Sequence, residues 1–114
     1  MTQDDNGLRA ALAALQPEIR QMLAEDLPVD LQRCRDAFAD TRWGELREYV
    51  HRIKGTASFC KLDDLRQVCL RIEEGLAQGS PPPASEMDGL AHESARVLAV
   101  LGSRAVIGLS PGAR

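Results

Sequence analysis

A histidine, a lysine and a glycine at offsets 0, +3 and +4 are the residues of this 114-residue chain best suited to chemistry: His51, Lys54 and Gly55. A neutral imidazole nitrogen is a good nucleophile near pH 7. An ammonium group one helical turn away would offset the charge of a phosphoryl group. A glycine at the next position of that turn would leave room for a partner to approach the imidazole. These three residue types at these offsets therefore suit phosphoryl chemistry at His51.

The surroundings of His51 in a helix support this interpretation. At about 100° per residue, Arg47, Ser58 and Gly55 fall within about 40° of His51, and the centre of the apolar stripe falls about 130° away. The histidine should therefore face solvent. Glu48 is the nearest acidic residue in the sequence, and residues 47–61 hold no acidic cluster that could bind Mg²⁺. We therefore expect neither a metal site nor a carboxylate base of this chain beside the imidazole.

Length and composition limit the number of domains and the class of protein. A chain of 114 residues is enough for one domain, which we place at 1–114 with loose ends at 1–6 and 109–114. Three cysteines without CxxC spacing argue against a zinc site or a disulfide framework and fit a reducing cytoplasm. A net charge of −3 argues against nucleic-acid binding. No apolar run is long enough for a membrane span.

The charge is unevenly distributed. Residues 41–72 hold seven basic and four acidic side chains, whereas both flanking regions are acidic. The basic excess surrounds His51 and would favour an acidic partner surface or a phosphoryl group. A solvated, ion-paired face is the plainer interpretation of the same charges.

Apolar residues recur at spacings of three and four along most of the chain, and no segment alternates with period two. Pro17 predicts a break near 15–16 with a helix at 17–25, and Pro28 predicts that a further helix begins there. Later helices are expected at 42–59, from 63 to about 78, and from 85 to about 101, with the prolines 81–83 as a stiff bridge. The sequence thus predicts an all-α protein, an antiparallel up-down four-helix bundle with an additional short N-terminal helix. The cleanest stripe is Trp43, Leu46, Val50, Ile53, Ala57 and Cys60.

The residues around His51 resemble a known family. HRIKGTA at 51–57 is similar to the H-x-[IL]-K-G-[ST]-A motif of the histidine-containing phosphotransfer (HPt) domain. Residues 37–46 are similar to the lead-in of such domains, and residues 65–73 to their L-x-x-x-C-x-x-L-E helix. The resemblance covers roughly residues 17–101. One position departs from it, because Cys60 stands where the family usually has a glycine.

The resemblance implies a phosphorelay intermediate of bacterial two-component signalling. Such a domain has no kinase activity: it accepts a phosphoryl group on His51 from a receiver-domain aspartate and passes it to another receiver aspartate. It needs no cofactor of its own, since Mg²⁺ is expected on the partner receiver. The implied partners are receiver domains of a hybrid sensor kinase and of a response regulator, bound by a cytoplasmic monomer. Partner contacts are expected from Arg47, Arg52, Ser58, Tyr49 and Phe59.

Two other functions fit the same pattern. The bundle could be a docking module that binds a signalling partner without obligatory phosphotransfer. It could also be a plain helical protein, for instance a dimerisation bundle, because a lone surface histidine on a helix usually has no function. His92 has no metal-ligand companions and is interpreted as a structural or surface residue. Tyr49 and Phe59 could be rim contacts for a partner or could pack on the N-terminal segment. The cysteines are expected in the core.

Overall fold

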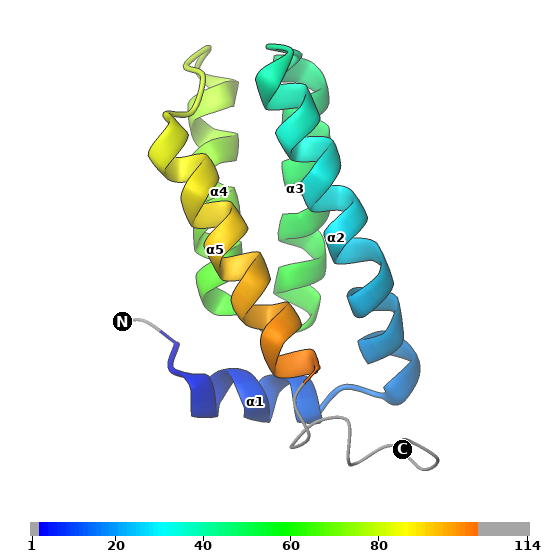
Figure 1. Ribbon diagram of the computed structural model, residues 1–114. Coiled ribbons are helices and arrows are strands. Elements are labelled where there is room, and N and C mark those ends of the chain that lie inside the picture. The colour runs from blue at the N-terminus through cyan, green and yellow to red at the C-terminus, as the bar shows by residue number, and fades with distance from the viewer. Residues whose placement is uncertain (1–2, 103–114) are drawn as a thin grey trace.

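Five α-helices make up the part of the chain, residues 3–102, that the computed structural model describes, and this part contains no strand. The helices are α1 (Asp5–Ala13), α2 (Pro17–Ala39), α3 (Trp43–Phe59), α4 (Asp63–Ala77) and α5 (Ala84–Leu101). Helices α2 to α5 run alternately up and down, and α1 lies across one end of them (Figure 1). Helix α3 packs between α2 and α4, and α5 contacts α2 and α4 and closes the bundle. The predicted all-α four-helix bundle with a short N-terminal helix is confirmed.

The core follows the predicted stripes. On α3, Leu46, Val50, Ile53 and Ala57 are buried. Trp43 is only half-buried and meets Phe38 of α2 edge to face at 5.9 Å between ring centroids. Fully burying one large apolar side chain contributes about 1.5–3 kcal/mol. This stripe therefore fixes the rotation of α3 and with it the face that His51 occupies.

The first proline behaves as expected and the second does not. Helix α1 ends at Ala13, and Pro17 is the first residue of α2, where its missing N–H costs nothing. Pro28 lies inside α2, which runs unbroken from 17 to 39, so the prediction of a new helix at Pro28 is wrong. Leu23, Leu27 and Cys34 keep one buried stripe on both sides of it. Their packing outweighs the roughly 3 kcal/mol that an interior proline costs.

The start of the chain is held more firmly than we expected. Of the loose segment predicted at 1–6, residues 3–6 are described: the Gln3 backbone N–H donates to the Asp64 carboxylate at 3.0 Å, and Asp4 caps α1 by accepting from the Gly7 N–H at 2.7 Å. Arg96 of α5 binds the Gln3 carbonyl at 2.8 Å and Asp64 at 3.0 Å. These contacts tie the first residues to α4 and α5. The predicted loose tail at 109–114 lies outside the described residues.

The corner between α3 and α4 accounts for the departure at position 60. Cys60 is buried at the C-terminus of α3 with φ of −89°, a conformation that needs no glycine. The left-handed position falls instead on Lys61, with φ of 60°. The Leu62 N–H donates to the Ala57 carbonyl at 2.8 Å and closes the turn. The substitution therefore leaves the corner tight and α4 in register beside α3.

Candidate functional site

His51 stands in the middle of α3 on its solvent face. Its side chain is 67% exposed, whereas Val50 and Ile53, which belong to the apolar stripe, are buried. The histidine therefore faces away from the core, as its position relative to the apolar stripe predicted. His51 lines a shallow depression together with residues from two helices: Gly44, Arg47, Glu48 and Arg52 of α3, and Glu73 of α4.

A carboxylate from the neighbouring helix lies against the imidazole, contrary to our expectation. Oε2 of Glu73 is 2.5 Å from Nδ1 of His51, and Oε1 of Glu73 is 2.5 Å from Nζ of Lys54. One side chain of α4 therefore contacts two of the three residues of α3 that the sequence singled out, His51 and Lys54. Glu48, the acid nearest in sequence, lines the same depression but does not make this contact.

The electrostatics of Glu73 favour its charged form. Its side chain is only 14% exposed, and this burial by itself raises the pKa of the carboxyl group. The contacts with Lys54 and His51 and their positive charge more than offset burial, so the pKa of Glu73 lies below its ordinary value. Near neutral pH the group is an ionised carboxylate, which can only accept hydrogen bonds.

This charge state determines the tautomer of the histidine. Because the Glu73 carboxylate accepts, Nδ1 of His51 must carry the proton that it shares with Oε2. In the neutral ring the lone pair is then on Nε2, at the outer end of an exposed side chain. The contact also holds the ring in one orientation. The arrangement is that of a nucleophilic nitrogen aimed at solvent, with an ammonium one turn away.

Gly55 faces open space. A Cβ built at this position meets no heavy atom within 4 Å, and the same is true of Gly44. Glycine inside a helix costs about 1 kcal/mol relative to alanine, and the packing of this chain does not require it at either position. Gly44 is seven residues before His51, so it lies on nearly the same face two turns away. Both glycines leave the approach to the imidazole clear.

Replacing Gly55 should separate stability from transfer. Gly55→Ala is expected to raise the free energy of unfolding by about 0.5–1 kcal/mol in urea, because the new methyl group meets nothing and alanine favours helix. Gly55→Leu is expected to be just as well folded yet to slow phosphoryl transfer by roughly tenfold or more, since its side chain would stand beside the imidazole. Undiminished transfer by a folded Gly55→Leu protein would show that clearance at this position is unnecessary.

The other predicted contact residues differ in their positions. Arg47 is exposed and lines the depression beside His51. Ser58 is also exposed, but it lies seven residues along the helix, about 10 Å from His51 along the axis. The structure therefore does not bring the Ser58 hydroxyl to the imidazole.

The two aromatic candidates have separate environments. Tyr49 is half-buried between the guanidinium groups of Arg33 and Arg52, at 5.8 and 5.7 Å from its ring centre. Through Arg33 it packs against α2. Phe59 is 68% exposed at the end of α3, which suits a rim contact. His92 is exposed on α5.

The described part of the chain holds neither a metal-binding cluster nor an ionised thiol. No group of three or more His, Cys, Asp or Glu side chains in residues 3–102 could hold a metal ion. The three cysteines are buried free thiols, as expected. Burial raises the pKa of Cys34 and Cys69 to about 12, so both are protonated and unreactive. None of the described helices is long and apolar enough to cross a membrane.

Fold and site together define a helical bundle that displays one oriented histidine. The Hpt domain family model matches residues 18–100, and the chain belongs to this family of phosphorelay modules. It is 33% identical over 97 residues to the sensor histidine kinase GacS of Pseudomonas protegens, a match covering 83% of this chain and 11% of that kinase. It is 32% identical over 88 residues to the sensor protein GacS of Pseudomonas syringae pv. syringae, covering 75% of this chain and 10% of that protein.

The chain thus spans about a tenth of the length of the curated relatives it matches. No solved structure gives a significant match. Sequence reasoning missed two residues of the site, Glu73 and Gly44. The sequence held one signal for Glu73, because the segment at 65–73 that resembles the family's L-x-x-x-C-x-x-L-E helix ends on this residue.

Proposed function

We propose that this domain accepts a phosphoryl group on Nε2 of His51 from an aspartyl phosphate of one receiver domain and passes it to an aspartate of another. The observation that carries the proposal is the contact of Glu73 with Nδ1, which leaves Nε2 as the free nitrogen of a solvent-exposed ring.

Each bond that forms or breaks in the proposed transfer can be assigned to a group on this domain or on the receiver. The lone pair on Nε2 of His51 attacks phosphorus, the N–P bond forms, and the bond from phosphorus to the receiver's aspartate oxygen breaks. The aspartate leaves as a carboxylate and needs no proton. The proton on Nδ1 stays in the contact with Glu73, which stabilises the positive charge that develops on the ring. The reverse sequence of bond changes returns the phosphoryl group to an aspartate.

In this proposal, Lys54 offsets the negative charge of the phosphoryl group. Its ammonium lies against Glu73 and is one turn from His51, so it is close to the oxygens that arrive on Nε2. Its positive charge offsets the negative charge of these oxygens both when the phosphoryl group arrives and when it leaves. We expect the Mg²⁺ that phosphoryl transfer between such groups requires to be bound by the receiver, and the domain to act as a monomer.

A two-step relay tests the proposal. The domain is phosphorylated by one purified receiver carrying ³²P, separated from it, and mixed with a second unlabelled receiver. We expect the label to move to the domain and then to the second receiver, leaving the domain unlabelled. If the domain takes up label from none of the receivers encoded in its source genome, or takes it up and cannot pass it on, the proposed function is wrong.

A further inference from the structure

The depression at His51 lies over the turns of α3 that precede the histidine. The α3 residues that line it are Gly44, Arg47, Glu48, His51 and Arg52, and Glu73 of α4 completes it. Side chains on a helix lean toward its N-terminus and cover the turn before their own Cα atom. The imidazole of His51 therefore leans toward the turn that carries Arg47. A phosphoryl group on its outer nitrogen would stand above that turn, where the depression leaves space for it.

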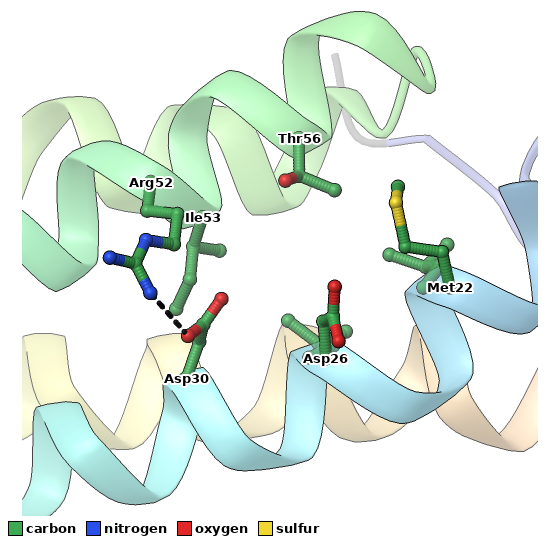
Figure 2. A pocket seen from close by; sticks show the side chains of 8 residues that line it. Met22, Asp26, Asp30, Arg52, Ile53 and Thr56 are labelled. Carbon is green, nitrogen blue, oxygen red and sulfur yellow. Dashed lines mark hydrogen bonds and ion pairs between the residues drawn. The ribbon is translucent and has the colours of Figure 1, made fainter.

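Two arginines line this depression, and only one of them is engaged by other groups. The guanidinium of Arg52 turns toward α2, where it pairs with Asp30 at 3.4 Å (Figure 2). It also lies over the ring of Tyr49, 5.7 Å from the ring centre. Arg47 is exposed and forms no ion pair or cation–π contact with any residue between 3 and 102. Its charge is therefore available to a group that arrives at His51.

A phosphoryl group on His51 needs more positive charge than Lys54 supplies. The group carries about two negative charges near neutral pH. The ammonium of Lys54 already lies 2.5 Å from Oε1 of Glu73, so part of its charge is offset. Glu48 adds a further acidic side chain to the depression. A second cation beside Nε2 would balance these negative charges.

The position of Arg47 suits this role. It stands four residues before His51, and side chains at this spacing are neighbours on the same face of a helix. Gly44, three residues before Arg47, has no Cβ and faces open space, so it does not obstruct the arginine side chain. A guanidinium stays charged at every ordinary pH and presents paired N–H groups that match two phosphoryl oxygens.

We propose that the guanidinium of Arg47 donates hydrogen bonds to the phosphoryl group when Nε2 of His51 carries it. Arg47 and Lys54 then hold this group from the turns before and after the histidine. The domain thereby keeps the phosphoryl group between its arrival and its departure, because removal by water is slowed. This inference rests on the proposed function, since it describes the state that the transfer creates. It gives Arg47 a role that requires no bound partner.

The lifetime of the phosphorylated domain, measured without any receiver, tests this role. The chain has two histidines, so His92→Gln protein leaves His51 as the only one, and every variant is made in this background. Phosphoramidate phosphorylates the protein: Nε2 bonds to phosphorus as the bond from phosphorus to the donor nitrogen breaks, and ammonia leaves. The donor is removed, and ³¹P nuclear magnetic resonance follows the loss of phosphohistidine.

Arg47→Gln should lose the phosphoryl group roughly threefold to tenfold faster than protein that keeps Arg47. In hydrolysis the departing group gives up negative charge to the ring nitrogen on the way to a loose, metaphosphate-like transition state. A cation on its oxygens therefore binds the phosphohistidine more tightly than the transition state and slows the loss. Arg47→Lys should fall between the two, because it keeps the charge but not the paired N–H groups.

Arg71→Gln is the matched control. Arg71 is exposed on α4 and does not line the depression, so its replacement removes the same charge and should leave the lifetime unchanged. A second measurement detects the contact itself: the Nε–H signal of Arg47 should shift and exchange more slowly with water on phosphorylation, and that of Arg71 should not. A merely structural role of Arg47 would not produce this change. Circular dichroism confirms that each variant is folded.

The possible failures are distinct. Equal lifetimes with and without Arg47, or equal shortening by Arg47→Gln and Arg71→Gln, overturn the role of Arg47 and leave the proposed function standing. A lack of transfer from every receiver overturns the proposed function, while the lifetimes after phosphoramidate treatment still decide the role of Arg47. If phosphoramidate leaves His51 unmodified, its outer nitrogen is not the nucleophile and both proposals are wrong.

Discussion

Replacing His51 with glutamine is expected to abolish phosphoryl uptake while the bundle stays folded. The imidazole is 67% exposed and contributes no packing to the core, so the substitution should change the free energy of unfolding by less than about 0.5 kcal/mol. Glutamine keeps a polar side chain of similar length but has no nucleophilic nitrogen. Incubation with a ³²P-labelled receiver, followed by gel separation, measures uptake by the wild type and the variant.

The second histidine provides the matched control for this prediction. His92 is also exposed but lies on α5, where no lysine and glycine accompany it at the offsets found after His51. His92→Gln should take up label at the wild-type rate. Equal labelling of the wild type and His51→Gln would show that the phosphoryl group is carried by another residue. Loss of labelling in His92→Gln would show that uptake depends on the histidine of α5.

Replacing Glu73 with alanine is expected to slow transfer to His51 by roughly 10- to 100-fold, equivalent to about 1.4–2.8 kcal/mol of activation free energy. The substitution removes the acceptor 2.5 Å from Nδ1, so the ring can rotate and the proton can move to Nε2. It also removes the negative charge that stabilises the ring when it becomes positive. Stopped reactions with a phosphorylated receiver give the rate constant for each variant.

Two control variants, Glu74→Ala and Glu73→Asp, distinguish the contact of Glu73 with His51 from a general change of charge. Glu74 is the next residue on α4 and is exposed, so Glu74→Ala removes the same charge without touching His51. It should transfer at close to the wild-type rate, and Glu73→Asp should fall between the wild type and Glu73→Ala. Binding of the receiver to Glu73→Ala should be unchanged. Similar slowing by Glu74→Ala and Glu73→Ala would mean that Glu73 acts only through long-range charge and does not position the ring.

The fold was largely predictable because the stripes of α3 and α4 are long and regular. Leu46, Val50 and Ile53 alone fix which face of α3 is buried, and His51 follows from them. Pro28 misled the prediction for a physical reason. Proline is unfavourable in a helix interior when only its neighbours in sequence are considered. Leu23, Leu27 and Cys34, however, form one buried stripe on both sides of Pro28, and their packing against the other helices outweighs the cost of the proline.

The site was predictable only where it lies within one helix. His51, Lys54 and Gly55 are related by the helical repeat, so their common face could be read from their spacing. Glu73 is 22 residues away from His51, and its contact depends on the register between α3 and α4. That register is set by the corner at Cys60–Leu62, including the left-handed Lys61, which local spacing does not reveal. Tyr49 likewise lies between two arginines because α2 packs beside α3.

The most direct test of the central claim is to observe which nitrogen carries the phosphoryl group. The domain, labelled with ¹⁵N at histidine, is phosphorylated by a receiver, and nuclear magnetic resonance detects coupling between ³¹P and the ring nitrogens. We predict coupling to Nε2 of His51 and a proton retained on Nδ1 beside Glu73. Coupling to Nδ1 of His51, or to a nitrogen of His92, would contradict the account.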